Sequence, residues 1–112
     1  MENCLFCKIA NKEIPAEIVY EDDKVIVFKD NKPVAPVHLL CVPKKHIQSV
    51  NHLNIEDKGL VGELFLTAQK IAREQGVAET GYRLIFNVGK DAGQTIDHLH
   101  LHLLGGKKLF WA

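Results

Sequence analysis

Three histidines, His98, His100 and His102, alternate with leucines near the end of this 112-residue chain, and they are half of its six histidines. In an extended strand every second side chain projects from the same face, so the three imidazoles share one face and the leucines the other. Neighbouring rings would then lie roughly 7 Å apart, and the outer two lie too far apart to bind one tetrahedral zinc ion. A neutral imidazole is a nucleophile or base near neutral pH because its pKa lies there. The row therefore indicates catalysis, with a metal site or a solvated polar face as the alternatives.

The loop before the histidines carries residue types that bind anions. Gly89 and Gly93 let the backbone turn its N–H groups toward a charged ligand, and Asn87, Gln94 and Thr95 add neutral donors. Beside a histidine nucleophile, these groups predict a phosphate-binding cradle. The glycines alone are equally typical of an ordinary hairpin loop, so the prediction depends on the histidines that follow.

Cys4 and Cys7 form a C-x-x-C pair near the N-terminus. A redox pair is disfavoured because no βαβ pattern surrounds it, which leaves two buried thiols in a short helix or a structural zinc site. Structural zinc takes four ligands, so the two cysteines would need histidine partners from elsewhere in the chain. Cys41 lies within a predicted strand and is expected in the core, and His52 is expected in a solvated loop.

Composition excludes several classes of protein. The 14 Lys and Arg residues balance 14 Asp and Glu residues, so the net charge at pH 7 is zero, which argues against a nucleic-acid or membrane-surface binder. No apolar run reaches the roughly 18 residues of a membrane span. The N-terminus lacks the basic and apolar regions of a secretory signal, so we expect a cytoplasmic protein with reduced thiols and no nucleic-acid or membrane partner.

Residue patterns predict an α+β fold in which residues 1–112 form a single domain. Apolar residues at helical spacing, including Leu60, Leu64 and Ala68, predict a long helix that Asn54 caps and Gly76 ends. A short N-terminal helix is expected at residues 4–10, and strands at 17–20, 25–28, 38–42, 82–88 and 98–104. Short connections favour antiparallel pairing, so we expect a five-stranded antiparallel sheet with the long helix on one face.

The sequence resembles the histidine triad (HIT) superfamily, whose signature is His-x-His-x-His with apolar residues between, and residues 98–104 match it. Other stretches are similar to the Hint-like branch, which contains the purine nucleoside phosphoramidases, and together they cover nearly the whole chain. They lie at residues 12–15, 20–23, 35–38, 43–47, 81–83, 93–95 and 104–106, followed by Trp111.

The resemblance implies an enzyme that hydrolyses the phosphorus–nitrogen bond of adenosine or guanosine 5′-phosphoramidates and also accepts aminoacyl-adenylates. His100, the middle histidine, would attack the α-phosphorus, and water would hydrolyse the nucleotidyl-histidine and release the nucleoside monophosphate. The alternative is a nucleotide-binding interaction module with little catalysis, and a weaker third possibility is a zinc-dependent hydrolase.

The resemblance also implies roles for individual residues. His102 would bond a phosphate oxygen and help to protonate the leaving amine, and His38 would orient the cluster unless it is simply a satisfied sheet histidine. Asp30 would accept bonds from the ribose hydroxyls, although by itself it fits a solvated loop carboxylate. The base pocket would be lined by Phe28 and Ile18, which also fit plain core positions. The phosphate would be held by Asn87, Gly93, Gln94 and Thr95.

Relatives of this type imply a structural zinc ion and a homodimer. The zinc ligands would be Cys4, Cys7, His46 and the first histidine of the triad, His98, which leaves His100 and His102 for chemistry. The dimer would form through the long helix and the fourth strand. Trp111 would reach the partner's active site, or else pack on its own subunit. Asp97 departs from the aromatic or apolar residue of some relatives, and we expect its effect to be modest.

Overall fold

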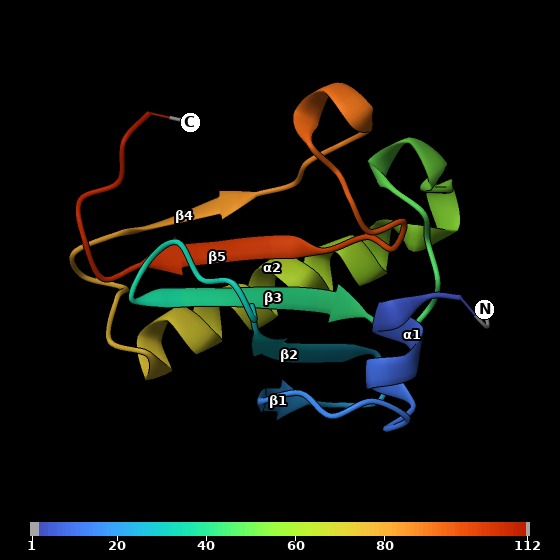
Figure 1. Cartoon of the computed structure of the whole chain (residues 1–112), viewed down its shortest axis with the longest axis horizontal. Helices are drawn as coiled ribbons and strands as arrows, with labels where there is room; N and C mark the ends of the chain where they lie inside the picture. The colour runs from blue at the N-terminus through green and yellow to red at the C-terminus, as the bar shows by residue number, and fades with distance from the viewer. Residues whose placement is uncertain (1–2, 112) are drawn as a thin grey trace.

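The computed structural model describes residues 3–111, and its five strands form one sheet in the order β1-β2-β3-β5-β4 (Figure 1). Every pair of neighbouring strands is antiparallel, and the predicted α+β fold with one long and one short helix is confirmed. The elements are α1 (Leu5–Ala10), β1 (Ile18–Glu21), β2 (Val25–Lys29), β3 (Val37–Pro43), α2 (Lys58–Glu74), β4 (Tyr82–Ile85) and β5 (Leu101–Gly105). Short 3₁₀ turns lie at Val50–His52, Ile55–Asp57 and Lys90–Ala92.

The central strands are buried on both faces, because a helix packs against each side of the sheet. Val25 and Val27 of β2 belong to the core under α2, whereas the alternate residues Ile26 and Phe28 pack with Phe6 of α1. This alternation explains why β2 is an uninterrupted apolar run rather than a strand with one polar face. The core under α2 also contains Cys41, as predicted, together with Leu99, Leu101 and Leu103.

The long helix begins slightly later than its sequence pattern suggests. The Asn54 N–H donates to Asp57 Oδ2 at 2.9 Å, but the residues between them form a 3₁₀ turn and the α-helix starts at Lys58. Phe65 and Leu66 are 44% and 63% exposed in this chain. The second apolar face of α2 is therefore only partly covered within residues 3–111, where Phe86 packs against Phe65 with ring centroids 6.0 Å apart. No helix among those residues is long and apolar enough to cross a membrane.

Two predicted strands are longer than the observed ones. β4 ends at Ile85 rather than Val88, and β5 begins at Leu101 rather than His98. The pairing of β4 with β5 ends at Ile85 and His102. Before β5 the chain turns to another partner, since the Leu99 N–H donates to the Ile47 carbonyl at 2.7 Å. Residues 98–100 thus lie beside the segment that follows β3.

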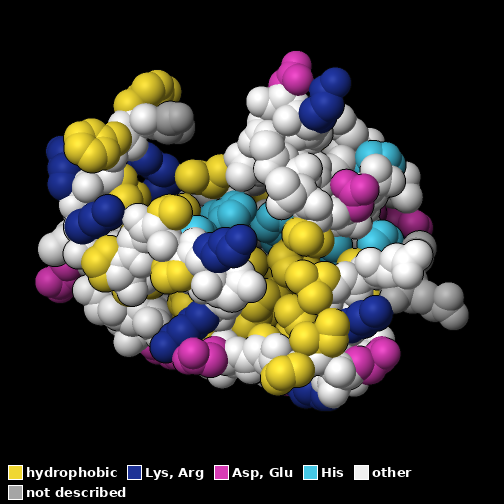
Figure 2. Space-filling model, viewed as in Figure 1, with side chains coloured by type: hydrophobic (Ala, Val, Ile, Leu, Met, Phe, Trp, Pro, Cys, Tyr) yellow, Lys and Arg dark blue, Asp and Glu magenta, His cyan; other side chains and the backbone are white. Residues whose placement is uncertain are grey.

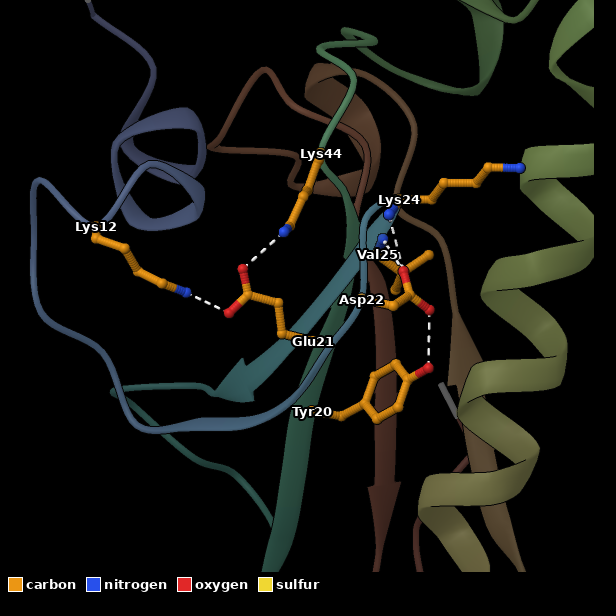
Figure 3. Close-up of polar contacts among 7 residues, drawn as sticks. All are labelled: Lys12, Tyr20, Glu21, Asp22, Lys24, Val25 and Lys44. Carbon is orange, nitrogen blue, oxygen red and sulfur yellow. Dashed lines mark hydrogen bonds and ion pairs between the residues drawn. The ribbon is translucent and has the colours of Figure 1, made fainter.

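A polar network fixes the edge hairpin of β1 and β2 (Figure 3). Asp22 Oδ1 accepts the backbone N–H groups of Lys24 and Val25, each at 2.8 Å, and Tyr20 donates to Asp22 Oδ2 at 2.8 Å. Glu21 pairs with Lys12 and with Lys44, and these hydrogen bonds hold the pKa of its carboxyl below the usual value. The network ties the segment after α1 and the end of β3 to the β1–β2 hairpin.

Candidate active site

A cavity of ≈ 570 Å³ opens between α1, the end of β2 and the loop that precedes the histidine row. His100 and His102 line it, and Figure 2 shows histidine side chains at the bottom of a hollow with hydrophobic side chains beside them. The apolar walls include Phe6 and Phe28, and the polar groups include Asp30, Asn87 and Thr95. The cavity thus combines an apolar wall with polar groups gathered around two imidazoles, which is typical of a small-molecule site.

The ring of His100 is held in one orientation. Its Nδ1 lies 2.7 Å from the carbonyl oxygen of His98, and because a carbonyl only accepts, Nδ1 carries the proton. The neutral ring therefore has its lone pair on Nε2. The edge of Phe6 packs against the ring, with centroids 5.2 Å apart and planes at 84°. A buried imidazole with a defined Nε2 lone pair beside a cavity can act as a nucleophile.

His102 is held by a chain of hydrogen bonds that begins at the backbone of Val34. The Val34 N–H donates to His38 Nδ1 at 3.2 Å, so the neutral His38 ring carries its proton on Nε2. That N–H points to His102 Nδ1 at 3.0 Å and lies 3.3 Å from Asp30 Oδ2. His102 Nδ1 is consequently an acceptor, and the His102 proton resides on Nε2.

Burial keeps the His38 and His102 rings neutral. It lowers the pKa of His102 to about 4, and the neighbouring His100 and His38 rings act in the same direction while the Asp30 charge opposes them. The pKa of His38 is also lowered, mainly by burial, with Asp30 again in opposition. His102 is therefore a neutral hydrogen-bond donor near pH 7, which suits a contact with a phosphate oxygen better than the delivery of a whole proton.

The four predicted metal ligands lie together at the other end of the histidine row. The ligand atoms of Cys4, Cys7, His46 and His98 are all within 4.8 Å of one another. His98 Nδ1 lies 3.2 Å from Cys4 Sγ and 3.5 Å from Cys7 Sγ, and Cys7 Sγ lies 3.4 Å from His46 Nδ1. Around a tetrahedral zinc ion with ordinary bond lengths, a sulfur ligand and a nitrogen ligand lie about 3.6 Å apart. The observed sulfur–nitrogen distances are close to this value, so these residues fit the ion.

The protonation pattern of this cluster also suits a cation. His98 Nε2 donates to the Pro43 carbonyl at 2.7 Å, which leaves Nδ1 unprotonated and directed at the sulfurs. Burial lowers the pKa of His98 to about 4 and so keeps the ring neutral. Burial and the adjacent Cys4 raise the pKa of the Cys7 thiol to about 11, because two close thiolates repel one another when no cation lies between them.

Asp30, His38 and His102 form a second cluster with ligand atoms within 4.8 Å. Its hydrogen bonds disfavour a metal ion there. A metal on His38 Nε2 would move the ring proton to Nδ1, where it would face the N–H of Val34. The same contact supports the hydrogen-bonded chain to His102, so this cluster is best described as a positioning network.

The structure gathers most, but not all, of the predicted site residues. Asp30, Phe28, Asn87, Gly93 and Thr95 line the cavity together with His100 and His102. The predicted spacing of roughly 7 Å between neighbouring rings is wrong for His100 and His102, whose centroids lie 5.0 Å apart with their planes at 62° in an edge contact. His100 precedes the first residue of β5, so the regular two-residue rise of a strand does not set this distance.

Gln94, Ile18 and Trp111 lie elsewhere. The Gln94 amide accepts from the Gly89 N–H at 2.9 Å and donates to the carbonyls of Gln48 and Ile96, so it braces the loop from within. Ile18, on edge strand β1, is 40% exposed and does not line the cavity. Trp111 is 93% exposed on a tail whose Phe110 carbonyl accepts a bond from Arg83.

Two contributors to the site were missed by sequence reasoning. Phe6 lies between the two cysteines and packs against His98, His100 and Phe28. The signal in the sequence that could have pointed to Phe6 is its position between the two cysteines of the C-x-x-C pair. The Val34 N–H sets the protonation of His38, and a backbone group leaves no signal in the sequence.

Comparison with known proteins finds relatives that match nearly the whole chain. A family profile described as "Scavenger mRNA decapping enzyme C-term binding" matches residues 3–109. A purine nucleoside phosphoramidase of Escherichia coli K12 is 45% identical over 108 residues, covering 96% of this chain and 91% of the relative. Protein HitA of Neisseria gonorrhoeae is 47% identical over 105 residues, or 94% and 97% of the two chains.

Solved structures agree with these relatives. The crystal structure of a HIT family hydrolase from Legionella pneumophila superposes with a TM-score of 0.96 at 50% identity, covering 97% of each chain. A histidine triad protein from Clostridium difficile gives a TM-score of 0.97 at 48% identity, covering 100% of this chain and 97% of the other. The histidine row, the fold and these likenesses together show that the chain belongs to the histidine triad family.

Proposed function

We propose that this protein is a hydrolase, specifically a purine nucleoside phosphoramidase that cleaves adenosine or guanosine 5′-phosphoramidates and aminoacyl-adenylates. The observation that carries the proposal is the orientation of His100, whose Nδ1–H is bound to the His98 carbonyl so that the Nε2 lone pair is free. The relationship to the E. coli relative named a purine nucleoside phosphoramidase supports the choice of reaction.

The reaction has two displacements at phosphorus. His100 Nε2 attacks the α-phosphorus and forms a nitrogen–phosphorus bond, while the original phosphorus–nitrogen bond breaks and its electron pair leaves with the amine, which takes a proton from water. Water then attacks the phosphorus of the nucleotidyl-histidine and loses a proton, which neutralises the hydroxide left by the first step. The His100–phosphorus bond breaks, its electron pair returns to Nε2, and the nucleoside monophosphate departs. A covalent intermediate divides one difficult hydrolysis into two easier steps.

His102 stabilises the charge that develops on the phosphoryl oxygens. Its Nε2–H is fixed in advance by the chain from Val34 through His38, so the donor need not reorganise during the reaction. Loss of one such fixed donor typically lowers kcat by about 10²–10³-fold. The leaving amine draws its proton from water in this scheme, because burial lowers the pKa of His102 to about 4 and a neutral imidazole is a very weak acid.

The rest of the cavity supplies groups for the nucleotide. Asn87 and Thr95 offer an amide and a hydroxyl for the phosphate, and Phe28 offers an apolar surface for the purine. Asp30 Oδ1 already accepts the Lys32 N–H at 2.8 Å, and its remaining acceptor capacity suits the ribose hydroxyls. Gln94 would act indirectly here, because its amide braces the loop that carries Gly93 and Thr95.

The metal cluster would hold Zn²⁺ in a structural role. Two thiolates and two imidazoles complete a tetrahedral shell, which leaves no open position at which the ion could bind substrate or water. We further propose a cytoplasmic homodimer that uses the exposed face of α2 around Phe65 and Leu66, with Trp111 near the partner's cavity.

The test is hydrolysis of adenosine 5′-phosphoramidate, with AMP release followed for the wild type, His100→Ala and His52→Ala. His52 is an exposed histidine outside the cavity and serves as the matched control. We expect turnover by the wild type and by His52→Ala, and none by a folded His100→Ala. Equal turnover by His100→Ala would reject the covalent mechanism, and AMP binding without turnover by any form would favour a nucleotide-binding module.

A further inference from the structure

The two contacts that orient His100 both originate in the metal cluster. One is the hydrogen bond from Nδ1 to the carbonyl of His98, a residue whose side chain is one of the four ligands. The other is the edge contact with Phe6, which lies between ligands Cys4 and Cys7. The remaining ring neighbour is His102, at 5.0 Å. Through Phe6, the position of the His100 ring thus depends on where the cluster holds α1.

The helix that carries Phe6 is held partly by its packing on the sheet and partly by this cluster. α1 contains six residues, and a helix of that length is not stable by itself in water. Phe6 and Ile9 anchor it to the sheet, while its N-terminal end is held by Cys4 and Cys7. Without a metal, the thiols of Cys4 and Cys7 contact the histidine rings of the cluster only through weak hydrogen bonds of 3.2–3.5 Å.

A bound metal would replace those weak contacts with a cross-link between distant parts of the chain. Cys4 and His98 are 94 residues apart in sequence, and His46 comes from the segment after β3. The backbone of residues 98–99 is already fixed from that side, because Leu99 donates to Ile47 and the His98 ring donates to Pro43. Metal binding would therefore act mainly on α1, because it would fix the N-terminal end of this helix against the rest of the chain.

We propose that the metal cluster is a clamp on the nucleophile, and that Phe6 is the positioning residue that transmits it. This inference rests on the proposed function, since His100 is taken as the nucleophile. Metal occupancy and the aromatic ring at position 6 should set kcat, with a much smaller effect on KM. A metal held by these four residues would take no part in bond breaking, because its tetrahedral shell would be complete.

The experiment compares zinc-loaded, zinc-free and zinc-restored wild type with Phe6→Leu and Ile26→Val. Ile26 is buried in the same apolar cluster as Phe6 but does not line the cavity, so its variant controls for lost packing. Bound zinc is quantified for each form, and the long-range ¹H–¹⁵N spectrum of His100 reports the ring environment without reference to turnover. Circular dichroism establishes that each form is folded.

We expect zinc removal to lower kcat by about 10- to 100-fold and to broaden or shift the His100 resonances, with both reversed by added zinc. Phe6→Leu should retain zinc, lower kcat by about 3- to 10-fold and shift the His100 resonances, since aromatic contacts have energies of that order. Ile26→Val should leave both unchanged. If zinc-free protein unfolds, Phe6→Leu in the loaded protein decides the question.

Other results would overturn the clamp. An unchanged His100 spectrum and kcat in Phe6→Leu would remove Phe6 from the pathway. Replacement of Zn²⁺ by Co²⁺, which shows thiolate coordination in the visible spectrum, should leave kcat nearly unchanged, and a large change would indicate metal chemistry instead. If the wild type proved inactive, the proposed function would fail, whereas the response of the His100 spectrum to zinc would still accept or reject the clamp.

Discussion

The chain of hydrogen bonds from Val34 through His38 to His102 makes a sharp prediction for His38→Phe. Phenylalanine preserves the ring at this buried position but removes both nitrogens. Val34 is 62% exposed, so water can replace the partner lost by its N–H. His102 Nδ1 then has no donor, and the free-energy difference that kept the His102 proton on Nε2 disappears.

The size of the effect follows from the value of one hydrogen bond to a charged group. A donor to a charged oxygen contributes about 1.5–3 kcal/mol, which corresponds to roughly 10- to 150-fold in rate. We therefore expect His38→Phe to lower kcat by about 10- to 100-fold. His38→Gln keeps an N–H that can reach His102 Nδ1, and it should recover most of that loss.

Two measurements check this prediction. AMP release from adenosine 5′-phosphoramidate gives kcat and KM, and long-range ¹H–¹⁵N correlations report which nitrogen of His102 carries the proton. In the wild type and His38→Gln the proton should be on Nε2, whereas His38→Phe should show it on Nδ1 or divided between the two. A folded His38→Phe protein with the wild-type tautomer and the wild-type kcat would refute the reasoning.

Three further predictions concern stability. Burial lowers the pKa of His102 from 6.5 in the unfolded chain to about 4 in the folded protein, so the unfolded chain takes up this proton first as the pH falls. The free energy of unfolding should therefore decrease as the pH drops from 6.5 toward 4. Urea unfolding midpoints should show a smaller decrease over this range in His102→Asn than in the wild type. Gln94→Ala removes the amide that joins the Gly89 N–H to the Gln48 and Ile96 carbonyls. We expect the free energy of unfolding to fall by about 1–2 kcal/mol and Tm to drop by roughly 5 °C. An unchanged Tm would show that water replaces the hydrogen bonds of the amide. Gly106→Ala should lower the free energy of unfolding in urea by about 1–3 kcal/mol. Gly106 has φ +92°, and a Cβ at this position would lie 3.0 Å from Pro36 Cβ. The control is Gly59→Ala, because a Cβ there meets nothing within 4 Å.

Local patterns predicted the architecture well. The alternation of histidines with leucines assigned the leucines to the core, and Leu99, Leu101 and Leu103 do pack under α2. The helical spacing around Leu64 and Ala68 likewise identified a helix whose buried face contains both residues. Such patterns succeed because a two-residue or 3.6-residue period decides which side chains share a face, whatever the element packs against.

The ends of the strands could not be predicted in this way. His98 continues the alternation, yet β5 begins only at Leu101, because Leu99 donates its N–H to Ile47 rather than to a neighbouring strand. Gln94 has the chemistry of a phosphate ligand, but the path of its loop provides three backbone partners first. Leu99 contacts Ile47 and Gln94 contacts Gln48, and both of these partners lie far away in the chain, where they leave no local pattern. The other two partners of Gln94, Gly89 and Ile96, are close to it in sequence, but the path of the loop decides that they face its amide.

The sequence by itself determined the fold class, the face on which the histidines lie and, through its resemblance to the histidine triad family, the residues worth testing. The tertiary structure alone decided which nitrogen of each ring carries a proton, because that depends on carbonyl and amide groups at Pro43, His98 and Val34. It also decided that Phe6 joins the cysteine pair to His100. Hydrogen-bond direction and ring contacts act over 3–6 Å in space, and only the folded chain brings those partners within that range.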